Sequence, residues 1–182
     1  MITQLIKSKQ DLNLEKLKDI DTFIIDADEK ITRSILESIK SKGIKNKVII
    51  LGRDNNFNRR MIEGTKISYL LSPEREIIEG KDRFRRKDSL KQRDSGLNHV
   101  VAKEATKKGI AIGIDFQEIK KLQGKEKATK LARIMQNIII CRKAKCKIKI
   151  LDLENKADKQ ELLSFAFSLG MSSQQAKEAI TD

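Results

Sequence analysis

The sequence is poor in the residues on which several kinds of protein chemistry depend. Its 182 residues include no tryptophan, one tyrosine, one histidine, one proline and two cysteines. A single histidine, His99, excludes most histidine-dependent metal sites. The cysteines, Cys141 and Cys146, form neither the repeated pairs of a zinc site nor a disulfide framework. We therefore expect both to be reduced thiols without a catalytic role.

The chain also lacks long hydrophobic runs. No apolar stretch approaches the ~20 residues that a membrane helix needs, and the first residues do not have the pattern of a secretory signal. A chain of this length can bury a sizeable core, and its composition is not of low complexity. We expect a cytoplasmic globular protein that does not bind membranes, with a single domain over residues 1–182.

The positive charge is concentrated in two stretches. Residues 81–93 contain seven basic and two acidic side chains, and residues 120–149 contain eleven and one. Together these stretches carry +15, more than the +13 of the whole chain, so the remainder is close to neutral. A surface that served solubility alone would have interspersed acids. The pattern predicts a polyanion partner, with nucleic acid favoured over an anionic membrane.

Aromatic residues indicate how such a partner would be bound. There are six phenylalanines and one tyrosine, and only Phe84 lies in a basic stretch. Few bases can therefore stack on this protein, so recognition should use phosphates and shape, and affinity should fall steeply with salt. The charge pattern does not separate RNA from DNA.

Short apolar runs rich in β-branched residues alternate with amphipathic stretches. The runs at 22–26, 48–51, 67–71, 110–114 and 147–151 predict strands, and the stretches 29–42, 97–108 and 126–145 predict helices. This order predicts an α/β fold with a mostly parallel sheet: an abbreviated or irregular TIM-barrel-like (β/α) fold, or an open doubly wound sheet. After Leu151 the pattern predicts a helical C-terminus, with helix starts at Asp158 and at Ser172 or Ser173.

Carboxylates follow several of the predicted strands and permit two interpretations. They are Asp26, Asp28, Asp54, Glu74, Asp115 and Asp152. At the carboxyl edge of a parallel sheet they are placed to hold Mg²⁺. The same positions are those where the following helix needs an N-cap, and we favour the capping interpretation.

Two further segments offer groups for an anion. Asp94 or Ser95 is placed to cap a helix that begins near Leu97, which would leave backbone N–H groups beside Arg93, with His99 in the first turn. In the long helix, a 100° step per residue separates two faces. The face expected to pack carries Ala128, Leu131, Ala132, Met135, Ile138 and Ile139, and the face expected to offer polar and cationic groups carries Lys130, Arg133 and Asn137.

These residues resemble the central signature of RNase P protein component 3, the archaeal counterpart of the eukaryotic thirty-kilodalton RNase P subunit. The similar positions lie between about Ile67 and Ile180. They are Arg93-Asp94-Ser95-Gly96-Leu97-Asn98-His99-Val100-Val101-Ala102-Lys103, Ile110-Ala111-Ile112-Gly113, Arg133-Ile134-Met135-Gln136-Asn137, Cys141-Arg142-Lys143, Leu169-Gly170-Met171-Ser172 and Ala176-Lys177. The basic run 81–91 is not part of the pattern.

The resemblance implies a TIM-barrel-like protein that binds the catalytic RNA of ribonuclease P and supports removal of the 5′ leader from precursor tRNA without being the catalyst. It implies protein component 2, in a heterotetramer, and the other archaeal RNase P proteins as partners, and Mg²⁺ that the RNA uses and this chain does not bind. The implied residues for RNA or partner binding, together with Lys130 from the helix face, are Arg93, Asn98, His99, Lys108, Arg133, Arg142 and Lys143. The alternatives are a metal-dependent phosphoesterase and a protein interaction module.

Overall fold

The short β-branched runs form one sheet. The computed structural model describes residues 3–11, 20–44, 46–78, 83–89 and 91–181. Six strands lie side by side in the order of the sequence, and every neighbouring pair is parallel. The strands are β1 (Thr3–Ile6), β2 (Thr22–Ile25), β3 (Lys47–Leu51), β4 (Tyr69–Leu71), β5 (Ala111–Asp115) and β6 (Ile148–Leu151).

Helices connect the strands and complete the C-terminus. They are a 3₁₀ helix η1 (Lys9–Asp11) and the α-helices α1 (Glu29–Ser41), α2 (Asn55–Gly64), α3 (His99–Lys108), α4 (Phe116–Lys121), α5 (Gly124–Ala144), α6 (Lys159–Ser168) and α7 (Ser173–Ile180). Within the described ranges, no helix combines the length and the apolar character that crossing a membrane requires.

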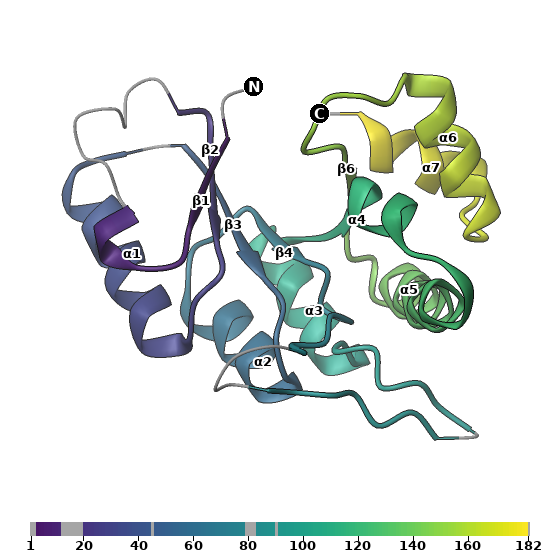
Figure 1. Cartoon of the computed structure of the whole chain (residues 1–182), viewed down its shortest axis with the longest axis horizontal. Coiled ribbons are helices and arrows are strands. Elements are labelled where there is room, and N and C mark those ends of the chain that lie inside the picture. The colour runs from purple at the N-terminus through teal and green to yellow at the C-terminus, as the bar shows by residue number, and fades with distance from the viewer. Residues whose placement is uncertain (1–2, 12–19, 45, 79–82, 90, 182) are drawn as a thin grey trace.

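The sequential strand order places the connecting helices on one face of the sheet. Connections between parallel neighbours are right-handed in nearly all proteins, so a sheet that always grows in the same direction receives its helices on the same side. Figure 1 shows α1, α2, α3 and α5 arranged around one side of the strands. The order confirms the TIM-barrel-like prediction over the doubly wound alternative, in which the strand order reverses.

Alternate residues of each strand pack on opposite faces of the sheet. In β2, Phe23 and Ile25 face the helices in the main core, whereas Ile24 packs with Ile49 and Leu71 in a smaller cluster on the other face. That second face would line the interior of a closed barrel. Among the described residues β1 and β6 do not pair with each other, so the barrel is open between them.

The predicted elements are found, with ends that differ by at most two residues, and four elements, β1, η1, α2 and α4, lie outside the predicted ranges. Three asparagines and a glycine, residues of low helix propensity, weaken the helix signal of α2, and β1, η1 and α4 are only three to six residues long. The capping interpretation is confirmed for Asp28, Asp54 and Asp115, which accept hydrogen bonds from first-turn backbone N–H groups of α1, α2 and α4. Asp158 caps α6 in the same way, and α7 begins with a capping box of Ser172 and Gln175.

The predicted orientation of the long helix α5 is wrong. Met135 and Ile139 were expected to pack, yet their side chains are exposed, whereas Lys130 and Arg133 are buried. The physical reason lies outside the helix: carboxylates of neighbouring segments surround the buried cations and compensate for their burial. Hydrophobic patterning alone does not reveal such partners.

A pair of neighbouring substitutions tests this orientation. Ile138 is 1 % exposed and Ile139 is 50 % exposed. We expect Ile138→Ala to lower the free energy of unfolding by about 2–5 kcal/mol, because it leaves a cavity in the core. Ile139→Ala should change it by no more than about 0.5 kcal/mol. Urea unfolding measures both, and equal losses would contradict the orientation.

Candidate nucleic-acid interface

A long connection between β4 and α3, residues 72–98, crosses the carboxyl ends of the strands. Ile77 and Phe84 pair across it in an antiparallel bridge, with Ile77 N donating to Phe84 O and Phe84 N to Ile77 O (both 2.9 Å). Figure 1 shows its described residues extending beyond α2 and α3 at the lower edge of the view. We call residues 83–89 and 91–93 the basic arm.

The buried guanidinium of Arg86 attaches the basic arm to the body. Its side chain is 0 % exposed. Nη1 donates to Asn55 Oδ1 (2.7 Å) and to Asp94 Oδ1 (2.8 Å), and Nε donates to the backbone oxygen of Arg75 (3.2 Å). Nη2 donates to the backbone oxygens of Arg53 and Pro73. One planar group thus joins the ends of β3 and β4, the start of α2 and the end of the arm.

Arg133 holds the arm from the other side. Its side chain donates to both carboxylate oxygens of Asp88 (3.0–3.2 Å) and forms an ion pair with Glu76 at 2.9 Å. With 6 % of its surface exposed, Arg133 cannot be the cation offered to phosphates that the helix pattern suggested. Its ion pairs instead fix the arm to α5.

The ammonium group of Lys130 is also paired with carboxylates and is not available to a ligand. Its Nζ lies 2.5 Å from a carboxylate oxygen of Glu118 and 3.9 Å from Glu74, and only 9 % of the residue is exposed. Burial raises the pKa of Glu74, and the charge of Lys130 only partly opposes this effect. The prediction that Lys130 offers its charge to a ligand therefore does not fit the structure.

Polar side chains of α5 position the turn that precedes α3. Gln136 Oε1 accepts from Arg93 N (2.9 Å), and its Nε2 donates to Arg93 O (2.8 Å) and to Ser95 Oγ (2.9 Å). Asn137 Nδ2 donates to Ser95 O at 3.0 Å. Asn98, rather than Asp94 or Ser95 as predicted, is the N-cap of α3, because its Oδ1 accepts from Val101 N.

A buried asparagine of α2 completes this support, and sequence reasoning missed it. Asn58 Oδ1 accepts from Arg53 N (2.8 Å), and its Nδ2 donates to the backbone oxygens of Pro73 (3.1 Å) and Gly96 (3.0 Å). Gly96 has φ +74°, and a Cβ there would lie 1.8 Å from Pro73 O. Glycine is therefore required at position 96, where the backbone passes close to Pro73.

Two glycines with similar backbone angles allow a matched test of this approach. Gly109 has φ +70°, and a Cβ there would have no neighbour within 4 Å. Gly109→Ala should lower the free energy of unfolding by about 1 kcal/mol through backbone strain alone. Gly96→Ala should lower it by clearly more, because the loop against Pro73 must move. Chemical denaturation measures both, and equal losses would contradict the role of Gly96.

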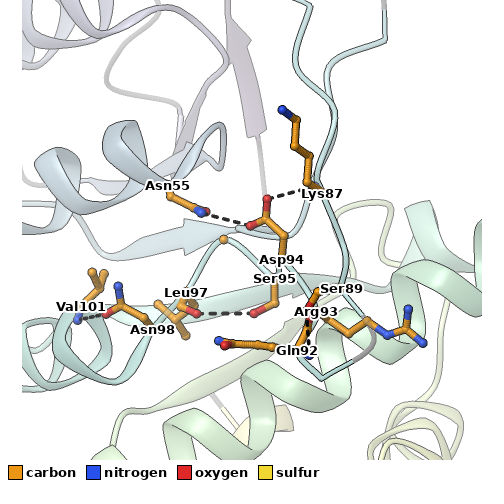
Figure 2. A pocket seen from close by; sticks show the side chains of 11 residues that line it. Asn55, Lys87, Ser89, Gln92, Arg93, Asp94, Ser95, Leu97, Asn98 and Val101 are labelled. Carbon is orange, nitrogen blue, oxygen red and sulfur yellow. Dashed lines mark hydrogen bonds between the residues drawn. The ribbon is translucent and has the colours of Figure 1, made fainter.

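A polar cavity of about 340 Å³ lies beside this turn, between the arm, α2 and α3. Its cationic lining residues are Lys87 and Arg93, and Figure 2 shows their side chains pointing outward and away from each other. The Arg93 side chain is 51 % exposed, and its Nη1 lies 3.9 Å from Asp88. Of the predicted residues, Arg93 and Asn98 line this cavity, and His99 is exposed in the next position of α3.

The other predicted residues lie at the opposite ends of the helices. Lys108 ends α3 and donates to the backbone oxygen of Glu63. Arg142 holds the α6–α7 turn, since its Nε donates to Gln175 Oε1 (2.7 Å) and its Nη2 to Gly170 O (2.6 Å). Lys143 is exposed in the last turn of α5. The predicted set is therefore divided between the two ends of the sheet.

The carboxylates after the strands are committed to caps and ion pairs. Asp26 receives two hydrogen bonds from Arg75 (2.9 and 3.0 Å) and one from Arg53 (3.4 Å). Burial raises the pKa of Asp26, but the hydrogen bonds and charge of Arg75 and the charge of Arg53 outweigh it, so that the pKa lies below its usual range. No group of three or more His, Cys, Asp or Glu side chains suited to a metal ion occurs in the described part of the chain.

The lowered pKa of Asp26 predicts a pH-dependent contribution to stability. A carboxylate with a lowered pKa stabilises the fold above its unfolded pKa of about 3.9, and this stabilisation disappears as the pH falls through the folded pKa. We expect Asp26→Asn to be less stable than the wild type at pH 7, with a difference that closes toward pH 2. Thermal unfolding at both pH values measures it. Glu37→Gln, at an exposed position of α1, is the control, and a constant difference for Asp26→Asn would contradict the prediction.

Comparison with known proteins shows a shared fold. The sequence matches no protein-family model and no curated protein. Its structure is similar to a chain of the cryo-EM structure of archaeal ribonuclease P with mature tRNA, with 20 % identity and a TM-score of 0.53 over 97 % of this chain and 86 % of that one. It is also similar to the crystal structure of an uncharacterized protein, with 13 % identity and a TM-score of 0.56 over 90 % of this chain and 42 % of that one.

Proposed function

We propose that this chain is a protein subunit of ribonuclease P that binds the catalytic RNA and supports removal of the 5′ leader from precursor tRNA. The observation that carries the proposal is the basic arm, a row of exposed cations held against a buried anchor. The fold shared with a chain of an archaeal ribonuclease P, and the resemblance of residues 93–103 to protein component 3, support the same assignment.

Exposed and buried side chains alternate along the arm, as they do along an extended strand. Phe84, Arg86 and Asp88 are partly or fully buried, whereas Arg83, Arg85 and Lys87, each of which precedes one of them, are exposed. Successive side chains of an extended backbone point to opposite sides. Because Arg86 and Asp88 are held by the body, the three cations that alternate with the buried residues are displayed together on the outer side.

These cations are available to a ligand. Among the described residues, none of the side chains of Arg83, Arg85 and Lys87 forms an ion pair, in contrast to Arg75, Arg86 and Arg133. A guanidinium presents a planar set of donors that fits phosphate oxygens. The arm therefore offers positive charge to a ligand, whereas Arg75, Lys130 and Arg133 are paired with carboxylates.

The chemistry favours RNA backbone as the ligand and gives this chain no hydrolytic role. With Phe84 as the aromatic residue of the arm, stacking on bases contributes little, and phosphate contacts dominate. In the proposed assembly the RNA holds the Mg²⁺ that acts in hydrolysis, and protein component 2 and the other RNase P proteins bind alongside. The cations of this chain reduce the repulsion between packed RNA strands.

Neutralising the arm tests the proposal. In Arg83→Gln/Arg85→Gln/Arg93→Gln, the slope of log affinity against log salt for RNase P RNA should decrease by about 2, since each phosphate contact contributes roughly 0.7–0.9. Fluorescence anisotropy across a salt series measures this slope. In a reconstituted cleavage of precursor tRNA, the same variant should require more Mg²⁺ than the wild type.

The control removes equal charge from scattered exposed sites. Lys30, Lys103 and Lys159 lie on α1, α3 and α6, and all three are exposed. Lys30→Gln/Lys103→Gln/Lys159→Gln should leave the salt slope within about 0.5 of the wild-type value, because it removes no fixed phosphate contact. An arm variant that behaves like this control would exclude the arm as the RNA surface. A wild-type chain that does not change cleavage would exclude the function.

A further inference from the structure

An open groove lies at the end of the sheet opposite the basic arm. The first residues of β4, β5 and β6, which are Tyr69, Ala111 and Ile148, line it together with Lys47 at the start of β3. The groove has a volume of about 870 Å³, and α7 borders it through Lys177. Because all strands are parallel, their amino ends share one edge, whereas the arm follows the carboxyl end of β4.

Lysines dominate this groove. Lys47, Lys147 and Lys177 are exposed, and none of them forms an ion pair with a described residue. Lys149 reaches the end of α7, where its Nζ donates to the backbone oxygen of Glu178 at 2.8 Å. Glu178 supplies the carboxylate of the lining. We call the site formed by these four lysines the lysine groove.

Other exposed lysines flank the lysine groove at the ends of two helices: Lys107 and Lys108 of α3, and Lys143 and Lys145 at the end of α5. Cations at helix C-termini stabilise the helix dipole, so these four need no ligand. That explanation does not extend to Lys47 and Lys147. Lys47 is the first residue of β3 and Lys147 immediately precedes β6, where no helix ends.

The cations at the two ends of the sheet differ in whether they are paired with carboxylates. At the carboxyl end, Arg75, Lys130 and Arg133 each lie within 3.0 Å of a carboxylate. At the amino end, Lys47, Lys147 and Lys177 form no ion pair with a described residue. Uncompensated like charges at one place repel each other and favour a polyanion that neutralises them.

We propose that the lysine groove is a second phosphate-binding surface, which holds the backbone of one RNA segment while the basic arm holds another. The inference rests on the proposed function and adds to it a bridge between two RNA segments bound at opposite ends of the strands. Ammonium groups act as point charges without the planar fork of arginine, so they fit backbone phosphates rather than base edges. Tyr69 is the aromatic residue of the lining, which favours duplex over stacked single strands.

A short RNA duplex and the full chain provide the test. At low salt, titration should show two duplexes per wild-type chain and one for Lys47→Gln/Lys147→Gln/Lys177→Gln. The arm variant described above should also bind one duplex, and the two variants combined should bind none.

The other outcomes show which of the two proposals fails. A groove variant that behaves like Lys30→Gln/Lys103→Gln/Lys159→Gln would overturn the inference. Loss of all binding in the arm variant alone would overturn it too and leave the proposed function intact. Loss of binding in the groove variant with an unaffected arm variant would instead contradict the arm. If the groove variant kept RNA binding but lost binding of polyglutamate, the groove would be a site for an acidic protein segment, and the inference would fall.

Discussion

The arrangement of the loops at the carboxyl ends of the strands depends on the burial of one guanidinium. Arg86 has no exposed side-chain surface, and it donates to a carboxylate, an amide oxygen and three backbone oxygens. A buried charge is tolerated only when it is paired and its donors are satisfied. Arginine meets this demand because its five N–H groups lie in one plane. Their partners come from four segments, so the burial of Arg86 decides where the β4–α3 connection runs.

The parallel architecture itself separates the charges. Helices that connect parallel strands begin at the carboxyl end of the sheet and end at its amino end. Helix N-termini favour carboxylates, which explains the capping residues Asp28, Asp54 and Asp115. Helix C-termini favour cations and collect lysines at the other end. At the carboxyl end, arginines such as Arg75 pair with acids and the arm displays exposed cations, whereas the groove at the amino end is lined by four lysines and one carboxylate, Glu178.

The fold alone does not decide the function, because one fold supports many chemistries. The carboxylates that a metal-dependent phosphoesterase would use are engaged otherwise: Asp26 with Arg75 and Arg53, and Asp54 and Asp115 with the first turns of helices. Among the described residues, these acids do not gather into a group that could hold a metal ion. The function is therefore inferred from the partners of individual side chains.

The sequence by itself determined the α/β alternation, most of the strands, several helix caps and the excess of positive charge, because these depend on neighbours within a few positions. It also indicated Arg93 and the turn before α3. Only the tertiary structure decided which cations are buried. Arg133 and Lys130 occupy the inward face of α5 since Asp88, Glu76 and Glu118 approach them from distant segments. The support from Asn58 likewise depends on the loops it joins, and a pairing between distant segments leaves no periodic signal in the chain.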